Sequence, residues 1–319
     1  MIFLQLLFST ALLFLVGVVR AEPSFVGAVS DHVLSSLMLD IDKAGNSERL
    51  VAVGDRGYVI WSDDFGKLWQ YATTPTDVLL TAVDFPSGMI GYAVGHDAVV
   101  LKTRDGGKTW SQVYEDREAQ VPLLDVFFID TDNGFVMGGH GYLRQTFDGG
   151  KTWKDRSDNI DNPDEFHYNG MTRLKGGMLL LVGEAGTLYR SGDNGKSWDL
   201  LSSPYKGTLF GVQALARPQS AIIYGLLGNA YITNDNGKTW QKWDTGTDQT
   251  LFNGLLIGGD RALLVGGNGT FSHSDGKNTK VGNRPRSAVL TGVIQAADGV
   301  FVVTGEHGVH RVDPGIVGQ

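Results

Sequence analysis

Five aspartates recur at nearly regular intervals and are the first residues whose types and spacing could support chemistry. They are Asp64, Asp105, Asp148, Asp193 and Asp235. Two carboxyl groups placed about 5–10 Å apart on either side of one bond would suit hydrolysis of a glycoside. Aspartate is equally typical of tight turns, where its side chain accepts backbone N–H groups. Because every copy stands in the same local motif, one per repeat, we interpret the five as structural.

The motif around each aspartate has eight residues, S/T-x-D-x-G-x-T-W, with little variation. Its copies cover residues 62–69, 103–110, 146–153, 191–198 and 233–240. The tryptophans that close them are 41, 43, 45 and 42 residues apart, a spacing typical of propeller blades. Only Trp61 and Trp243 lie outside these motifs, which leaves few tryptophans to stack on a sugar.

A second motif precedes each aspartate motif and raises the number of repeats to seven. It is an apolar run that ends in glycine, then two variable residues, usually another glycine, and a second apolar run. The leading glycines are Gly54, Gly95, Gly138, Gly183, Gly225, Gly266 and Gly305. The last two units lack a complete aspartate motif, and residues 272–276 resemble an eroded one.

Each unit predicts four strands, which we name A to D. In the second unit we expect strand A at residues 80–85, strand B at 91–95, strand C at 98–103 and strand D at 109–114. The glycine-flanked pair predicts a B–C hairpin turn, and the aspartate motif, or Asp box, predicts the C–D turn. Seven units of this kind predict an all-β fold, a seven-bladed β-propeller of four-stranded antiparallel blades with Asp-box C–D turns.

The ends of the chain predict its location and how the ring closes. Residues 2–19 are almost continuously apolar, so we expect a signal peptide over residues 1–21 and a single propeller over residues 22–319. An uncleaved membrane anchor is the alternative. We expect the periplasm, or the extracytoplasmic side of the inner membrane if the segment stays as an anchor. Residues 25–29 are predicted to add the outer strand of the seventh blade and so clasp the two ends.

Charge and composition exclude several classes of partner. The formal net charge is −8 and there is no basic stripe, so we expect no nucleic-acid partner. The absence of cysteine excludes disulfides and a lipid-modified cysteine. We expect no cofactor, no metal, a monomer, and at most peripheral association with a membrane.

Polar residues gather in the predicted B–C turns, which should surround the central channel on the face opposite the Asp boxes. The candidates for partner binding are Asp55, Arg56, His96, Asp97, His140, Glu184, Glu306 and His307, joined by Arg284 and Arg286 before the last strand A. Binding residues are often carried on loops of this kind. A merely solvated rim would be polar as well, and a weak metal site at His96, His140 and His307 is a further alternative.

The longest predicted D–A loop runs from Asp155 to Tyr168 on the same face. It carries Asp155, Asp158, Asp161, Asp164 and Glu165, followed by Phe166, His167 and Tyr168. We expect a flexible acidic loop whose aromatic residues are available as a contact anchor. Calcium is an alternative ligand, although the loop lacks the spacing of an EF-hand.

At the Asp boxes the sequence resembles the BNR/Asp-box superfamily of sialidases, xyloglucanases, sortilin-type receptors and photosystem II assembly factors. It is most similar to the photosystem II stability/assembly factor family, whose repeat is seen at residues 94–110 and 182–198. The resemblance spans the whole mature chain. It implies a non-enzymatic propeller that binds proteins and assists assembly of a membrane or envelope complex.

Departures from the family repeat at Leu68, at Ala98 and in the last two boxes leave the client of such a protein unidentified. The alternative function is a carbohydrate-active propeller, either glycoside hydrolase- or sialidase-like or glycan-binding. The early Arg-Ile-Pro motif of sialidases is absent. A function has to be argued from a site rather than from the fold, so the enzyme alternative depends on a catalytic pair that the sequence does not reveal.

Overall fold

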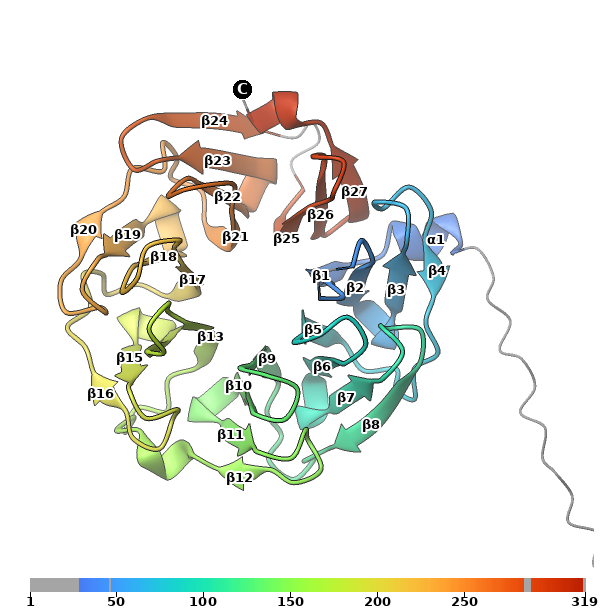
Figure 1. Ribbon diagram of the computed structural model, residues 1–319, viewed down its shortest axis with the longest axis horizontal. Coiled ribbons are helices and arrows are strands. Elements are labelled where there is room, and N and C mark those ends of the chain that lie inside the picture. Colours follow the sequence, from blue (N-terminus) through green and yellow to red (C-terminus); the bar gives the residue numbers. More distant parts are fainter. Residues whose placement is uncertain (1–28, 46, 284–287, 318–319) are drawn as a thin grey trace, which may run out of the picture.

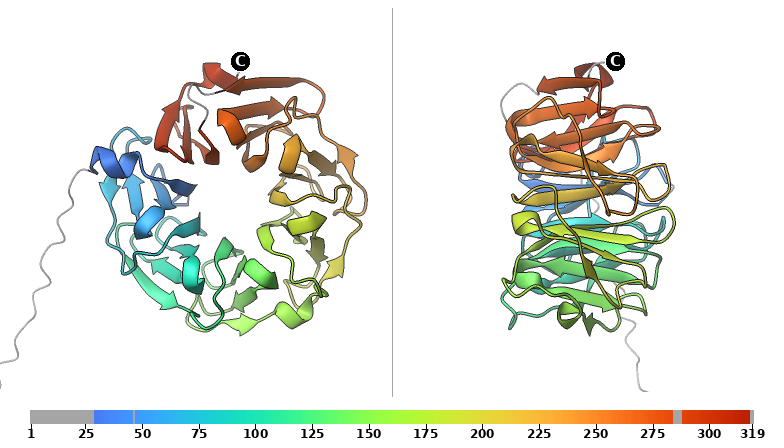
Figure 2. Two further views of the ribbon diagram at one scale, coloured as in Figure 1. Left: turned by 180° about the vertical axis from the view of Figure 1, so that it is seen from behind. Right: turned by 90° about the vertical axis from the view of Figure 1, so that its left-hand side faces the viewer.

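The computed structural model describes residues 29–45, 47–283 and 288–317, and it confirms the predicted seven-bladed propeller. Seven small antiparallel sheets stand around a central channel (Figure 1). From the side the molecule is flattened, and the connections between strands form its two faces (Figure 2). The predicted signal segment and residues 25–28 of the predicted clasp lie outside the described residues. Within the described ranges, no helix is long and apolar enough to cross a membrane.

The blades follow one another in chain order, and the strands of each blade run from the channel outward. Blades 1 and 2 comprise β1 (Met38–Lys43), β2 (Leu50–Gly54), β3 (Val59–Ser62), β4 (Gln70–Tyr71), β5 (Leu80–Asp84), β6 (Gly91–Gly95), β7 (Val100–Thr103) and β8 (Trp110–Tyr114). Blades 3 and 4 comprise β9 (Leu123–Phe128), β10 (Gly134–Gly138), β11 (Leu143–Thr146), β12 (Lys154–Asp155), β13 (Tyr168–Arg173), β14 (Leu179–Gly183), β15 (Leu188–Ser191) and β16 (Asp199–Leu200).

The remaining blades repeat the pattern. Blades 5, 6 and 7 comprise β17 (Leu209–Ala214), β18 (Ala221–Gly225), β19 (Ala230–Thr233), β20 (Gln241–Lys242), β21 (Leu251–Leu256), β22 (Ala262–Gly266), β23 (Thr270–Ser274), β24 (Thr279–Asn283), β25 (Leu290–Gln295), β26 (Phe301–Gly305) and β27 (Gly308–Val312). The helical pieces are α1 (Asp31–Leu34), η4 (Ser157–Asn159), η8 (Pro314–Val317) and the B–C turns η1 (Asp55–Gly57), η2 (His96–Ala98), η3 (Gly139–Gly141), η5 (Glu184–Gly186), η6 (Leu226–Gly228) and η7 (Gly267–Gly269).

The second blade shows how closely the pattern of the sequence predicts the strands. Strand B matches β6 residue for residue, and strands A and D each differ from the prediction by one residue. Strand C starts at Val100 instead of residue 98, because His96–Ala98 form the short helical turn η2. The second strand of every blade is buried along its whole length, which explains its continuous apolar sequence, since neighbouring blades cover both of its faces.

The seven leading glycines are required by a close backbone contact. Each ends strand B with an extended backbone, and a Cβ atom there would lie 1.9–2.2 Å from the carbonyl oxygen of the residue before strand A. That carbonyl accepts a hydrogen bond of 2.8–3.0 Å from the first N–H of the B–C turn, in all seven blades. The turn can approach the inner strand so closely only because glycine has no side chain.

The ring closes where blade 7 meets blade 1. One apolar cluster joins Met38 and Ile41 of β1 to Ile294 of β25 and Val302 of β26. The hydroxyl of Thr291 donates to the carbonyl of Met38 at 2.9 Å. In the described residues the sheet of blade 7 has three strands, β25, β26 and β27, and the outer-strand clasp stays a prediction.

A glycine-to-alanine pair tests the close contact. In Gly225→Ala the new Cβ would lie 2.1 Å from the carbonyl oxygen of Thr208. We expect the free energy of unfolding to fall by at least about 2 kcal/mol, because backbone has to move. Gly192→Ala is the control, since its Cβ would meet only the Met178 side chain at 3.6 Å. Equal urea midpoints for the two variants would contradict the role of the contact.

Candidate functional site

The five Asp boxes are self-contained hydrogen-bond networks. In each box the Ser or Thr hydroxyl accepts the glycine N–H at 2.8–2.9 Å. One aspartate oxygen accepts the backbone N–H four residues later at 2.9–3.0 Å. In four boxes the other oxygen accepts the hydroxyl of that same residue at 2.6–2.7 Å. In the first box Leu68 has no hydroxyl to donate. The carboxylates are therefore occupied by their own turns.

The protonation states of the box aspartates also oppose a catalytic role. The hydroxyl of Thr152 is the largest cause that lowers the pKa of Asp148 to about 2. At Asp193 and Asp235 burial acts in the opposite direction, but hydrogen bonds within the turn still lower the pKa of each to about 2. A general acid at neutral pH needs a raised pKa, so these groups are unsuited to that role.

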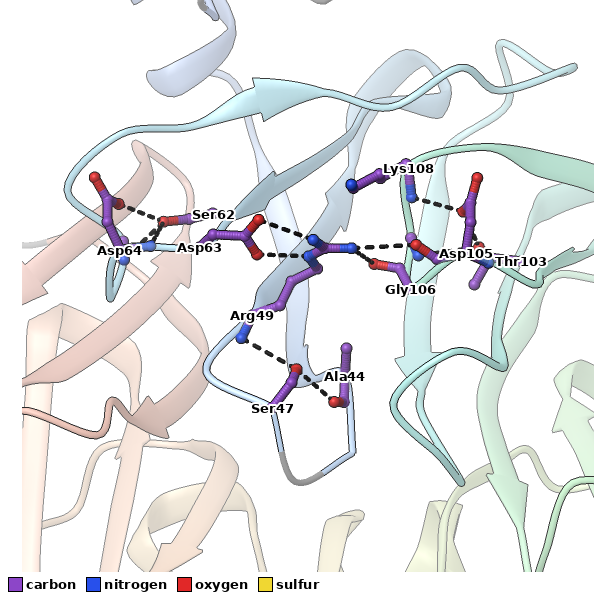
Figure 3. Close-up of polar contacts among 12 residues, drawn as sticks. Ala44, Ser47, Arg49, Ser62, Asp63, Asp64, Thr103, Asp105, Gly106 and Lys108 are labelled. Carbon is purple, nitrogen blue, oxygen red and sulfur yellow. Dashed lines mark hydrogen bonds and ion pairs between the residues drawn. The ribbon is translucent and has the colours of Figure 1, made fainter.

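The boxes of blades 2 and 3 are also bonded to the blade that precedes them. Arg49, between β1 and β2, binds both oxygens of Asp63 at 2.6 and 2.8 Å and donates at 3.1 Å to the carbonyls of Asp105 and Gly106 in blade 2 (Figure 3). The ammonium of Lys102 in blade 2 donates to the carbonyl of Gly149 in blade 3 at 2.6 Å. The polar groups on this side, which we call the box face, thus serve the fold.

The opposite side carries the B–C turns and D–A loops, and we call it the turn face. In the first six blades the middle residue of the B–C turn has a positive φ of 51–56°. The middle residue is exposed in all seven turns. The exposed middle residues are Arg56, Asp97, His140, Ala185, Leu227, Asn268 and His307.

The structure brings only some of the predicted binding residues together. His140 of blade 3 lies 5.1 Å from His167, ring centroid to ring centroid, and His167 Nδ1 lies 3.7 Å from Glu184 Oε2 of blade 4. Asp55 contacts its neighbour Arg56 at 3.6 Å. His96 with Asp97 and Glu306 with His307 are exposed on blades 2 and 7, and Arg284 and Arg286 lie outside the described residues. Among the described residues no group of three or more His, Asp or Glu side chains is placed to hold a metal ion.

The first strands form the walls of the channel, and no residue of a B–C turn lines the cavity there; the ring of B–C turns around its mouth stays a prediction. The second residue of every first strand faces a cavity of about 560 Å³. These residues are Leu39, Thr81, Leu124, Asn169, Phe210, Phe252 and Thr291. In each blade this residue sits at a register shift between strands A and B, a bulge of the kind that redirects a side chain. The cavity has an aromatic side, where Phe210 and Phe252 lie 5.0 Å apart.

Four inner-strand aspartates that the sequence analysis missed connect the first four blades. Each accepts a backbone N–H of the next blade, at 2.7–2.9 Å. The pairs are Asp40 with Val83, Asp42 with Phe85, Asp84 with Phe128, and Asp125 with Met171. The inner strand of a blade has no further strand to bond to, and these carboxyl groups satisfy some of its free donors.

Burial strongly disturbs the ionisation of these aspartates. It raises the pKa of Asp40 to about 8, of Asp125 to about 7 and of Asp42 to about 6. Burial and the neighbouring Asp42 raise the pKa of Asp84 well above its usual range. Such shifts are common at functional sites, but here the groups are engaged by backbone N–H donors between blades. The only signal in the sequence was a carboxylate inside an otherwise apolar strand.

The long D–A loop, for which we expected flexibility, makes several specific contacts. The Asn162 side chain donates to the carbonyl of Phe166 and accepts its N–H, at 2.9 and 3.1 Å. Tyr189 of blade 4 donates to the carbonyl of Asp161 at 2.6 Å, and Ile160 is buried in the core. The contact with Tyr189 comes from a residue distant in sequence, so the acidic composition alone does not reveal it.

The tryptophans leave no open platform for a sugar ring. Trp61, Trp69, Trp110 and Trp243 are buried, and Trp153, Trp198 and Trp240 are partly buried. The indole N–H groups of Trp69, Trp110 and Trp240 donate to glycine carbonyls of their own boxes. No tryptophan is therefore exposed for stacking on a glycan.

Comparison with known proteins agrees with the resemblance inferred from the Asp boxes. The sequence matches the family described as photosynthesis system II assembly factor YCF48 over residues 28–122 and 115–253. No curated protein matches it. The structure of YCF48 bound to D1 peptide has a TM-score of 0.71 and 17% sequence identity, covering 92% of this chain and 98% of that chain.

Two further solved structures share the fold. YCF48 from Cyanidioschyzon merolae has a TM-score of 0.70 and 18% identity, covering 88% of this chain and 97% of that chain. The WD40 β-propeller domain of Doa1 has a TM-score of 0.66 and 12% identity, covering 90% and 96%. At these identities the structural likeness shows the fold alone.

The raised pKa of Asp40 predicts a pH-dependent effect of Asp40→Asn. The pKa of this carboxyl group is higher in the folded protein than in the unfolded chain. Its contribution to the free energy of unfolding is therefore fully present below the unfolded pKa and is lost as the pH rises towards 8. Asparagine stays neutral and can still accept the Val83 N–H. We therefore expect the free energy of unfolding of the variant, relative to that of the wild type, to rise by at least about 1 kcal/mol from pH 5 to pH 9. Urea unfolding at each pH measures this difference.

The matched control for that experiment is Asp77→Asn, which removes a carboxylate from an exposed loop of the turn face. The comparison removes the effect of a general change in net charge. A difference between Asp40→Asn and wild type that is constant from pH 5 to pH 9 would show that Asp40 is ionised in the fold at neutral pH.

Proposed function

The chain belongs to the photosystem II assembly factor YCF48 family, and we propose that it is a non-enzymatic propeller that binds a protein segment of a membrane or envelope complex during assembly. The observation that carries the proposal is the family match, which extends over residues 28–122 and 115–253. The solved relative that holds a D1 peptide supports peptide binding by this kind of propeller. The proposed client of the present chain is a membrane or envelope protein.

The turn face is the side that suits a partner. On the box face the Asp-box carboxylates are engaged in their own turns, and Arg49 and Lys102 link neighbouring blades. On the turn face the exposed turn residues, the acidic loop and the mouth of the channel lie on one side of the ring. Loops held by a rigid scaffold are typical binding elements, and burial of Phe210 or Phe252 against a partner would add apolar contact.

We further propose that the protein acts outside the cytoplasm. The apolar segment at residues 2–19 supports export, with residues 1–21 as a signal peptide and the periplasm as the destination. A propeller there would meet the parts of membrane proteins that project from the bilayer, as a monomer in peripheral contact with the membrane. A carbohydrate-active function has no comparable support, because no tryptophan is exposed.

The proposal predicts that a defined membrane complex is captured through the turn face. The protein, tagged at its C-terminus, is crosslinked in its native cells, and the captured proteins are identified by mass spectrometry. The test variant replaces five exposed or half-exposed residues with alanine: His96, His140, Glu184, Glu306 and His307. We expect at least a tenfold loss of the captured complex, since these side chains would lie within the interface.

A matched variant on the box face is the control. It replaces the five exposed lysines of the Asp boxes with alanine: Lys67, Lys108, Lys151, Lys196 and Lys238. Both variants should keep the melting temperature of the wild type within a few degrees. Equal loss from both variants would place binding elsewhere, and capture of no specific complex by the wild type would contradict the assembly function.

A further inference from the structure

The channel carries a tyrosine at a position where four of the blades have valine. The position is the fourth residue of strand B, whose side chain is completely buried in the other six blades. In blade order the residues there are Val53, Val94, Met137, Val182, Tyr224, Val265 and Thr304. Tyr224 instead lines the channel cavity. Blade 5 therefore departs from the repeat and places a phenol at the wall of the channel.

Two glycines allow the side chain of Tyr224 to reach this cavity. A Cβ atom on Gly211 would lie 2.3 Å from the hydroxyl oxygen of Tyr224, and one on Gly254 would lie 3.1 Å from its ring. Both glycines line the cavity. Tyr224 is only 4% exposed, and its hydroxyl makes no hydrogen bond with a described residue although its oxygen stays accessible. Buried polar groups are nearly always hydrogen-bonded, so this hydroxyl is placed to bond a group that enters the channel.

Two carboxyl groups line the same cavity without a counter-charge. Asp40 and Asp125 are half-buried there, and neither forms an ion pair with a described residue. The backbone N–H groups that they accept leave lone pairs of each carboxylate free. No described lysine or arginine lines the cavity, and the imidazole of His167 at its mouth lies 3.7 Å from Glu184.

The ionisation of these groups reflects the missing positive charge. Burial raises the pKa of Asp40 to about 8 and that of Asp125 to about 7. Burial, and after it the charges of Asp125 and Asp40, raise the pKa of Tyr224, so the three groups lie within electrostatic reach of one another. A cation in the cavity would stabilise both carboxylates.

The three polar groups approach the channel from different sides. Asp40 lies in blade 1, Asp125 in blade 3 and Tyr224 in blade 5, so that another blade intervenes between each and the next (Figure 1). The rings of Phe210 and Phe252, 5.0 Å apart, add an apolar wall to the same cavity. This arrangement suits a ligand that carries a positive charge at the end of an apolar stem.

We propose that the channel receives a lysine side chain from the protein partner, an inference that rests on the proposed function and names one chemical feature of the bound segment. An ammonium group has three N–H donors around the end of its stem, which suits acceptors on three sides of a channel. The four-carbon stem would lie against Phe210 and Phe252. Arginine presents its donors as a planar fork and matches acceptors on separate blades less well.

A small probe, N-acetyl-lysine methylamide, tests the channel directly. The methionine methyl groups of the protein are labelled with ¹³C, and their chemical shifts are followed at about pH 8.5 and constant ionic strength. Met171 lines the cavity and reports on binding, whereas Met89 is exposed in the loop between β5 and β6 and should not shift.

Two analogues of the probe separate charge from shape. The arginine analogue keeps the charge, and the analogue acetylated on the side-chain nitrogen loses it. We expect a saturable shift of the Met171 methyl group with the lysine probe. Arginine should bind at least threefold more weakly, and the acetylated analogue should not saturate the shift.

Three variants separate the parts of the site. Asp40→Asn combined with Asp125→Asn should weaken lysine binding at least tenfold, because charge-assisted interactions are lost while each amide oxygen can still accept its backbone N–H. The matched control combines Asp42→Asn with Asp84→Asn, which also bond the next blade but do not line the cavity, and should change the affinity less than about twofold. Tyr224→Phe should weaken binding about threefold or more. Its melting temperature should not fall, since the hydroxyl that it removes bonds no described residue.

The outcomes distinguish this inference from the proposed function. Equal binding of the lysine probe and its acetylated analogue, or equal affinities of the channel variant and its control, overturns the lysine site even if the membrane complex is still captured. A working lysine site in a protein that captures no complex supports the site and overturns the assembly function. Capture that Asp40→Asn with Asp125→Asn leaves intact overturns the inference that the partner presents the lysine.

Discussion

The close approach of each B–C turn to its inner strand is the constraint on which the propeller depends. Seven times, the carbonyl before strand A accepts the first N–H of the turn while the end of strand B passes within contact distance. This contact fixes the register of the inner strand against the second strand. It thereby sets the bulge that turns one residue of each blade into the channel. Glycine is the only residue that permits the approach, which is why all seven blades keep it, whereas only five keep a complete Asp box.

The two faces of the ring therefore have different freedom. On the box face the residues of one short turn close the turn and hold the tryptophan, and in the box of blade 2 they also contact the neighbouring blade, so a change there disturbs several interactions at once. In the B–C turns of the turn face the contact with the inner strand is made by backbone atoms, and the middle side chain is left to the solvent. A loop such as residues 155–168 can be long and acidic without loss of the fold, because Asn162, Tyr189 and Ile160 hold it at a few points. Binding properties can be altered on that face at little structural cost.

The repeat motifs carried enough information to predict the blades, their number and the order of their strands. They did so because each blade is a local unit in which apolar runs, glycines and turn residues agree. The channel could not be predicted in the same way. Asp40 and Asp125 look like surface residues in the sequence, and only the ring of neighbouring blades turns them into buried acceptors of backbone N–H groups. The position of the long loop depends likewise on Tyr189 of blade 4, which donates to the carbonyl of Asp161 across 28 residues of sequence. Sequence periodicity describes the inside of a blade and says little about the space between blades.

The residues just before β1 occupy the position that a D–A loop would have after blade 7. In blades 1, 4 and 5 the glycine that ends the B–C turn lies against the carbonyl group of a residue four positions before the next strand A. These residues are Thr76, Tyr205 and Thr247. In blade 7 the corresponding glycine, Gly308, faces the carbonyl of Leu34, which lies four residues before β1. A contact between these two residues can form only after nearly the whole chain has been synthesised. Each blade can assemble from local hairpins as it emerges, but the circle is completed in one late, long-range step whose entropic cost the rest of the ring has already reduced.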